Sequence, residues 1–361
     1  MKTGKNIVSH RRTFSSILLQ WYGQYKRDLP WRNTTDPYKV WLSEIILQQT
    51  RIEKGIPFYD KFLFCFPTVE ALAGAPLQEV LRLWQGLGYY TRARNLHACA
   101  IKVVSDYGSV FPGSFNELLR LPGIGPYTAA AIASFCFDEP VVALDGNSIR
   151  LLTRYLDYGE DVNLAAARNQ LFRLSSTLVP AGKPGLFNQA LMDFGSMVCK
   201  SPVPDCGHCP LSFGCGAYRT GRQSILPVRK RKIRKKNRFL NYLVFLDGDV
   251  VYMRKREDRD IWHGLFEFYL IETSDVRDLH HLFIEDFGKM LPGVIFLDGP
   301  HDYKHVLTHQ NLFIRFHLVE IKKQYVKDRL ASSGFREFTM AQIERLPKPI
   351  IIERFLKEKI I

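Results

Sequence analysis

The sequence lacks any apolar run long enough to cross a bilayer. Its first residues, MKTGKNIVSHRRTF, also lack the continuous apolar stretch of a signal peptide. These two absences argue against a membrane protein and against a secreted one. We therefore expect a cytoplasmic protein without a membrane partner, whose seven cysteines are reduced thiols unless a metal holds them.

Acidic side chains are few compared with basic ones. The chain has 50 Lys and Arg against 36 Asp and Glu, which gives a formal net charge of +14. An excess of this size favours a polyanionic partner, and charge alone allows DNA, RNA or a membrane surface. About half of it lies in residues 229–238, where eight of ten side chains are basic. This segment is either a solvated linker or a contact with a DNA backbone.

The apolar pattern changes along the chain. Up to residue 217 it has mainly helical periodicity, as in the amphipathic segment 13–25. Residues 218–238 are polar and basic without a period, so we expect a linker there. Residues 239–361 alternate like strands and predict a smaller α/β domain, with a hairpin turn at Asp247-Gly248-Asp249. In this domain we expect strands at 239–246, 250–253, 265–271 and 311–321, and helices at 275–290 and 350–359.

The stretch LPGIG at residues 121–125 predicts a tight hairpin between two helices, at 114–120 and 128–137. Gly123 and Gly125 permit positive φ and a close approach of the backbone to a partner. The free N–H groups of the second helix would suit a phosphate. A strand-like run then leads to Asp145, just before another amphipathic helix. Taken alone, this stretch would favour an ordinary helix turn with Asp145 as the helix cap.

Three further segments carry residues suited to nucleic-acid chemistry. WLSEIILQQTRI at 41–52 predicts a helix with Glu44 in its first turn, where a carboxylate also suits the helix dipole. Trp31 and Arg32 follow a rigid Leu-Pro turn, although such a pair also serves packing and surface charge. WQGLGYYTRARNLH at 84–97 interleaves aromatics with arginines, which suits base stacking and phosphate contacts but also a helix start with buried tyrosines.

Four of the seven cysteines lie within seventeen residues in the pattern C-x6-C-x2-C-x5-C, namely Cys199, Cys206, Cys209 and Cys215. Prolines and glycines between them let the backbone wrap around a site. Four thiolates suit tetrahedral zinc or an iron–sulfur cluster, and the spacing does not choose between these. The other three cysteines have apolar surroundings typical of a core.

Together these motifs resemble the helix-hairpin-helix DNA glycosylase superfamily, and SE-x-x-LQQT with GLGYY-x-R-x-RNLH resembles its MutY-type adenine DNA glycosylases. The resemblance implies a mainly α glycosylase region at 1–217 with a 4Fe-4S loop at 199–215, a basic linker at 218–238, and a Nudix-like α/β domain at 239–361 that recognises 8-oxoguanine. It implies a DNA repair enzyme that acts, as a monomer, on double-stranded DNA. The enzyme would hydrolyse the N-glycosidic bond of adenine opposite 8-oxoguanine or guanine after flipping the base out.

The resemblance also assigns roles to residues. Glu44 would be the catalytic acid and Asp145 would stabilise the sugar cation, with Tyr127 and Asn147 hydrogen-bonding around them. The four cysteines would hold a 4Fe-4S cluster, with zinc as the alternative. The remaining roles are DNA contacts (Arg32, Gln49, Tyr89, Gly123 and Gly125), an adenine pocket (Trp31, Arg32 and Gln189) and a lesion-reading loop (Leu307, Thr308 and His309).

Further absences narrow the activity. Bifunctional members of the superfamily carry a lysine nucleophile where this chain has Tyr127, whose phenol cannot form a Schiff base. This argues for a monofunctional enzyme over a pyrimidine-lesion glycosylase with lyase activity. The Nudix hydrolase signature is missing, so we expect no pyrophosphate hydrolysis. Leu307 departs from the family, which commonly has an aromatic there. Because Glu44 and Asp145 are both present, a non-catalytic DNA-binding or redox module is disfavoured.

Overall fold

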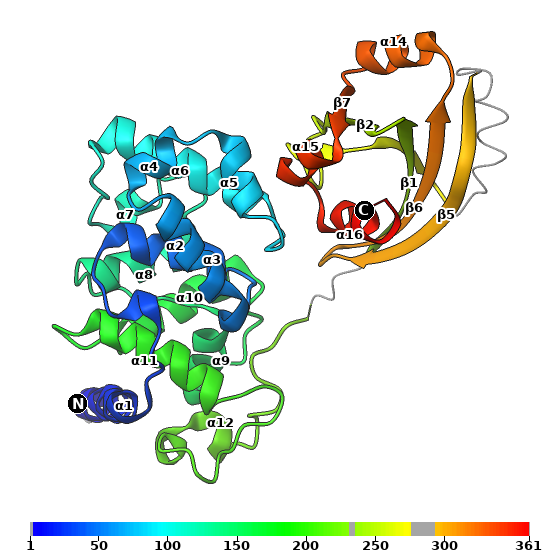
Figure 1. The fold of residues 1–361 in the computed structure, drawn as a ribbon. Helices are drawn as coiled ribbons and strands as arrows, with labels where there is room; N and C mark the ends of the chain where they lie inside the picture. Colours follow the sequence, from blue (N-terminus) through cyan, green and yellow to red (C-terminus); the bar gives the residue numbers. More distant parts are fainter. Residues whose placement is uncertain (1–2, 231–234, 276–292, 361) are drawn as a thin grey trace. The chain divides into compact units, whose positions relative to one another are not determined.

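The computed structural model describes residues 3–230, 235–275 and 293–360. The chain forms two compact units. One combines Met1–Gly74 with Asn95–Lys232, and the other combines Ala75–Arg94 with Ile233–Ile361. The first is helical, and the strands belong to the second (Figure 1). None of the described helices is long and apolar enough to span a membrane.

The helical unit begins with α1, and its short helices are started by local sequence signals. Asp36 caps α2 by accepting a hydrogen bond from the N–H of Tyr38, at 2.9 Å, and Ser114 caps α7. Proline opens α2, α8 and α11, where its missing N–H costs nothing. The main helices are α1 (Thr3–Tyr25), α2 (Pro37–Leu47), α3 (Ile52–Cys65), α4 (Val69–Gly74), α6 (Thr91–Tyr107), α7 (Phe115–Leu118), α8 (Pro126–Cys136), α9 (Gly146–Tyr155), α10 (Ala165–Ser176) and α11 (Pro184–Met197), with shorter turns η1 (Pro30–Arg32), η2 (Ser212–Gly214) and α12 (Gly216–Arg219).

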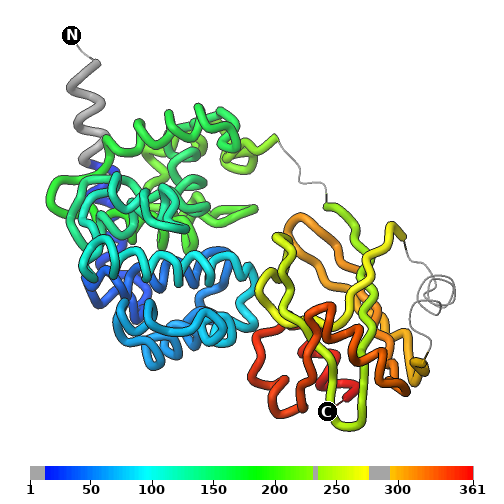
Figure 2. The backbone as a smooth tube through the Cα atoms, turned by 90° about the horizontal axis from the view of Figure 1, so that it is seen from above, coloured from blue at the N-terminus to red at the C-terminus, as the bar shows by residue number. Residues whose placement is uncertain are grey.

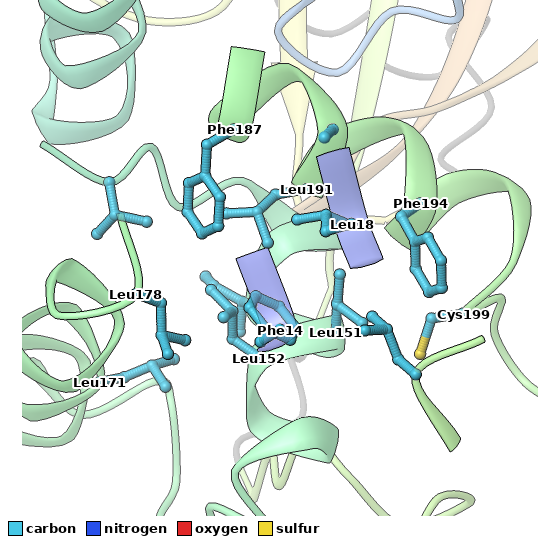
Figure 3. Packing of buried hydrophobic residues seen from close by; sticks show 14 of the residues in the cluster. Phe14, Leu18, Leu151, Leu152, Leu171, Leu178, Phe187, Leu191, Phe194 and Cys199 are labelled. Atoms are coloured by element: carbon cyan, nitrogen blue, oxygen red, sulfur yellow. The ribbon is translucent and has the colours of Figure 1, made fainter. Parts of the chain in front are cut away.

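A hydrophobic core joins α1, α9 and α11 (Figure 3). Phe14 and Leu18 of α1 are fully buried, as the apolar stripe of that helix predicts. They pack with Leu152 of α9 and Phe187 of α11. Helices α2 and α8 pack against each other, and α8 also contacts α11. The first turn of α9, which Asp145 precedes, is therefore held by a rigid apolar layer.

The second unit contains α5 (Leu77–Leu83) and one mixed sheet with strand order β3-β2-β1-β6-β5, in which β4 pairs with β1 and β7 with β2. Strands β5 and β6 form a long antiparallel pair, seen edge to edge in Figure 2. Strand β1 lies parallel to β6 and antiparallel to β2. The strands are β1 (Lys236–Asp247), β2 (Val250–Lys255), β3 (Phe266–Glu267), β4 (Tyr269–Thr273), β5 (Val294–Val306), β6 (Gln310–Ile321) and β7 (Arg336–Thr339), and the helices after the sheet are α14 (Gln324–Ser332), α15 (Met340–Arg345) and α16 (Ile350–Lys359).

The predicted fold class, helical and then α/β, is confirmed. The hairpin turn between β1 and β2 forms where expected, with Asp247 opposite Val250. Strand β6 and helix α16 also match the predicted segments. The predicted helix at 275–290 lies almost wholly outside the described residues. Strand β5, in contrast, was missed, because most of its side chains are exposed and show no clear apolar alternation.

Candidate active site

A cavity of about 970 Å³ lies in the helical unit and brings together residues that are far apart in the sequence. Its walls come from η1, α2, the hairpin before α8, the start of α9 and α11. Every site residue that the sequence predicted for this unit, apart from the cysteines, lines it: Trp31, Arg32, Glu44, Gln49, Gly123, Gly125, Tyr127, Asp145, Asn147 and Gln189.

Glu44 is the buried acid of this cavity. It is only 6% exposed, on the side of α2 that packs toward α8. Burial raises the pKa of Glu44 from its ordinary 4.5 to about 7, and the charge of Asp145 adds to the rise. A hydrogen bond with Tyr127 and the charge of Arg32 oppose the rise. Burial also holds the pKa of Tyr127 well above its ordinary value, so its phenol stays neutral beside Glu44. The Tyr127 hydroxyl donates to the Met192 sulfur at 3.7 Å.

Asp145 is the second carboxylate and caps α9. Its Oδ1 accepts a hydrogen bond from the backbone N–H of Ser148 at 2.6 Å, and its Oδ2 accepts one from the Asn147 amide at 2.9 Å. The positive end of the α9 dipole lies at the same place. These donors stabilise negative charge on Asp145. One cavity thus contains two carboxylates in contrasting surroundings.

Asn147 is itself held in place by Arg150. The Arg150 guanidinium donates to Asn147 Oδ1 at 3.0 Å and to the carbonyl of Cys199 at 2.8 Å. Helix α11 approaches closely here, because a Cβ added to Gly195 would lie 2.7 Å from the carbonyl oxygen of Asn147. A glycine is therefore required for this packing. The hydrogen bonds of Arg150 connect the Asp145–Asn147 pair with the start of the cysteine loop.

The hairpin glycines differ in conformation. Gly123 has φ of +73°, and an added Cβ would lie 2.6 Å from Cβ of Asn95. Gly125 has φ of −93° and is extended, with open space around an added Cβ. The sequence allowed positive φ at both glycines, and only Gly123 uses it, because Gly125 already serves as the residue preceding α8.

Gln49 follows α2 at the cavity wall and is exposed, with φ of +57°. Positive φ is uncommon for residues other than glycine and is often found at functional sites. No pattern in the sequence predicted this strain. Trp31, in contrast, is buried, and its ring packs edge-on against Tyr59 with centroids 5.2 Å apart.

The remaining predicted nucleic-acid contacts belong to the other unit. Tyr89 is also strained, with φ of +51°, and its hydroxyl hydrogen-bonds with Thr308. Leu307, Thr308 and His309 form the connection between β5 and β6, closed by a hydrogen bond from the N–H of Leu307 to the carbonyl of Gln310 at 2.8 Å. Leu307 packs against the core of its unit, so an aliphatic side chain here serves packing.

Cys199, Cys206, Cys209 and Cys215 are unpaired thiols that line one small cavity. Arg154, also in its wall and buried, places Nη1 3.3 Å from the Cys199 sulfur and 2.8 Å from the Lys200 carbonyl. Within the described ranges no three His, Cys, Asp or Glu side chains converge as a ready ligand set for a single ion. The four thiols thus do not converge on one point here, but by their chemistry four cysteines lining one cavity beside a cation are a donor set that a metal centre held by thiolates requires.

Sequence reasoning missed Arg150, Arg154 and Asp193, which all lie on helices. Asp193 is fully buried and binds Arg27 and Arg32. A usable signal was present, since Asp193 is the single charge in the segment PGLFNQALMDFGSM. A charge inside an apolar helical pattern must have a buried partner.

Comparison with known proteins defines the class. Residues 42–174 match the family described as HhH-GPD superfamily base excision DNA repair protein, and residues 241–358 match the NUDIX domain. The fold resembles a solved thermostable thymine-DNA glycosylase, with TM-score 0.56 and 34% identity over 59% of this chain and 99% of that one. It also resembles endonuclease III trapped on DNA, with TM-score 0.51 and 19% identity over 61% of this chain and 99% of that one, a likeness of fold alone.

Full-length similarity identifies the family. The adenine DNA glycosylase of Buchnera aphidicola subsp. Baizongia pistaciae is 33% identical over 93% of this chain and 94% of its own length. The mouse adenine DNA glycosylase is 43% identical over 62% of this chain, which spans 45% of that longer protein. The chain therefore belongs to the adenine DNA glycosylase family.

The raised pKa of Glu44 predicts a pH-dependent stability. Unfolding releases Glu44 to its ordinary pKa of 4.5, so the folded state binds more protons between pH 4.5 and 7. Stability is therefore lost as pH rises through that window, by about 3 kcal/mol if the full shift is realised. In urea unfolding measured from pH 4 to 8, the free energy of unfolding of the wild type should fall relative to that of Glu44→Gln. Glu53→Gln, an exposed change on α3, is the control. A wild-type to Glu44→Gln difference that is constant across this range contradicts the assignment.

Proposed function

We propose that this chain is a monofunctional adenine DNA glycosylase that removes adenine opposite 8-oxoguanine or guanine from double-stranded DNA. The family membership supports base excision repair by hydrolysis of an N-glycosyl bond. The observation that carries the proposal is the pairing of Glu44, whose pKa is about 7, with Asp145 in one cavity. We also propose that it acts as a monomer.

Glycosidic cleavage needs two carboxylates in opposite protonation states. With the extruded adenine in the cavity, protonated Glu44 gives its proton to N7, and the base leaves as a neutral molecule. Asp145 stays negative and stabilises the oxocarbenium-like sugar. Water then attacks the sugar and gives a proton to the Glu44 carboxylate, which restores the acid. On base entry the neutral phenol of Tyr127 would donate to one oxygen of Glu44 and leave the other oxygen for the proton.

The residues that line the cavity explain why strand cleavage is not expected. A lyase needs an amine that forms a Schiff base with the sugar. Among the described residues that line the cavity there is no lysine, and Tyr127 occupies the place where lyases of the superfamily carry theirs. The proposed product is therefore an intact strand with an abasic site.

DNA would be held by backbone and by intruding side chains. The hairpin at Gly123 and Gly125 leads into α8, whose free N–H groups suit a phosphate. Gln49 and Tyr89, both with strained backbones, are proposed to enter the base stack. Trp31, Arg32 and Gln189 would surround the extruded adenine. The net charge of +14 adds non-specific attraction to the phosphates.

For the four cysteines we propose a 4Fe-4S cluster, with zinc as the alternative. The thiolates of Cys199, Cys206, Cys209 and Cys215 would hold it, and Arg154 beside the Cys199 sulfur would offset their negative charge. A cluster bound there would supply a cross-link that fixes the loop. We further propose that residues 1–217 carry the chemistry, 218–238 the linker, and 239–361 the reading of 8-oxoguanine through Thr308 and His309.

Replacing the acid tests the chemistry. Glu44→Gln keeps the shape of the side chain and removes its proton, so single-turnover excision should fall by about 10²–10⁴-fold while binding of the lesion duplex survives. The wild-type rate should also decline as pH rises above 7, because Glu44 is then deprotonated. Glu53→Gln should excise normally. A Glu44→Gln rate within a few-fold of wild type sinks the assignment.

Iron analysis tests the metal centre. Purified protein should be yellow-brown with about four irons per chain, as four thiolates on one cluster require. Cys206→Ser should weaken DNA binding strongly while changing thermal stability little. Cys65, which the sequence predicted to lie in the core, is exposed, so Cys65→Ser should change neither DNA binding nor thermal stability. Colourless protein with one zinc per chain would decide for the alternative.

Lesion reading is tested by a preference ratio. Thr308→Ala with His309→Ala should reduce the preference for adenine opposite 8-oxoguanine over adenine opposite guanine by about 5- to 100-fold, because one or two base-edge hydrogen bonds supply ~1–3 kcal/mol. The rate opposite guanine should hardly change. Thr177→Ala, an exposed threonine of the helical unit, is the control. An unaltered ratio would move lesion reading to Gln49 and Tyr89.

A further inference from the structure

One wall of the cavity carries a chain of hydrogen bonds that begins at a buried carboxylate. Asp193 accepts from Arg27 Nε at 2.8 Å and from Arg32 Nη2 at 2.9 Å. Arg32 Nη1 donates to the phenol oxygen of Tyr22 at 3.2 Å. The Tyr22 hydroxyl donates to Gln189 Oε1 at 2.7 Å. Gln189 and Asp193 are one turn apart on α11, so both face α1 and η1 from the same side of that helix.

The chemistry of the donors fixes the direction of this chain. A guanidinium can only donate, so the Tyr22 oxygen must accept from Arg32. The single phenol proton is then left for Gln189. Burial raises the pKa of Tyr22, which keeps that proton in place. Tyr22 is 4% exposed, so the hydroxyl has little access to water as another partner.

The Gln189 amide is consequently held by its carbonyl. Its NH2 group must point away from Tyr22, and Gln189 lines the cavity together with Glu44. Among the described residues none accepts a hydrogen bond from this nitrogen. A flipped amide would set its NH2 group against a hydroxyl that has only one proton to give and would leave that proton unpaired.

We infer that Tyr22 is a positioning residue that locks the Gln189 amide with its N–H donors toward the extruded base, so that Gln189 reads a ring nitrogen of adenine. The inference rests on the proposed function. N1 and N3 of adenine are bare acceptors, whereas guanine presents donors at N1 and N2 that would oppose the Gln189 donor. N7 is excluded because it takes the proton of Glu44. Tyr22 would thereby contribute to base choice without touching the base.

The test is single-turnover excision from duplexes that carry adenine, 1-deazaadenine or 3-deazaadenine opposite 8-oxoguanine. Tyr22→Phe should slow adenine removal by about three- to tenfold, the value of one neutral hydrogen bond. Wild type should itself excise the analogue that lacks the recognised nitrogen more slowly than adenine. On that analogue Tyr22→Phe should cause no further loss of rate. Gln189→Leu should remove the same hydrogen bond to the base, so the double variant should be no slower than Gln189→Leu alone.

Controls separate positioning from folding. Tyr158→Phe removes another buried phenol, which donates to the Ala167 carbonyl at 2.9 Å and does not line the cavity. It should act equally on all three substrates. Gln189→Glu keeps an acceptor for Tyr22 but offers no donor to the base. It should therefore slow excision of adenine and leave excision of the analogue without the recognised nitrogen unchanged. This variant tests the inference even if Tyr22→Phe folds poorly.

Equal slowing of all three substrates by Tyr22→Phe, or additive effects of Tyr22→Phe and Gln189→Leu, would overturn the inference and leave Tyr22 a packing residue. Failure of the proposed function has a different signature, since wild type would then release no adenine from any duplex. In that case both proposals fall together. Excision by wild type without any analogue-dependent effect of Tyr22→Phe refutes only the role of Tyr22.

Discussion

The site depends on one electrostatic constraint, the presence of two carboxylates in a single cavity that buries one of them. Glu44 is buried and Asp145 lies close enough to raise its pKa further. Burial is the main cause of the raised pKa of Glu44, and a second negative charge nearby in a low dielectric adds to it. The surroundings of the two carboxylates differ. Asp145 has two hydrogen-bond donors and a helix N-terminus, whereas Glu44 has burial and one phenol.

This difference is maintained by helix packing. Asp145 keeps its donors because α9 is anchored through Leu152 to α1 and α11. Helix α11 contributes twice more. Gly195 permits the close approach to Asn147, and Asp193 binds Arg27 and Arg32 in the cavity wall. Helix α11 thus supports both the Asp145–Asn147 pair and the two arginines.

The sequence predicted the fold class from local patterns, whereas the cavity residues of the helical unit followed from motifs that resemble a known family. Apolar periodicity placed α8 within two residues. Helix α2 begins at Pro37 and ends at Leu47, four and five residues before the predicted bounds, so Glu44 lies well inside the helix and not in its first turn. What the sequence could not give was long-range pairing. Arg150 with Asn147, and Asp193 with Arg32, are contacts whose partners are set by tertiary packing. Backbone strain at Gln49 and Tyr89 has no composition signal either, and the exposed side chains of β5 hid that strand from an alternation test.

Two neutral phenols influence which groups at the cavity donate hydrogen bonds and which accept them. Burial raises the pKa of both Tyr22 and Tyr127, so each hydroxyl keeps its proton and can donate one hydrogen bond. Tyr127 lies beside Glu44, and its hydroxyl donates to the Met192 sulfur at 3.7 Å. Tyr22 accepts a hydrogen bond from Arg32 and therefore donates its own hydrogen bond to Gln189. A phenol differs here from water or serine because its ring fixes the position of the oxygen in the core. Two buried tyrosines, one lining the cavity and one bonded to the lining residue Gln189, can therefore determine which neighbouring groups remain donors and which remain acceptors before any base enters.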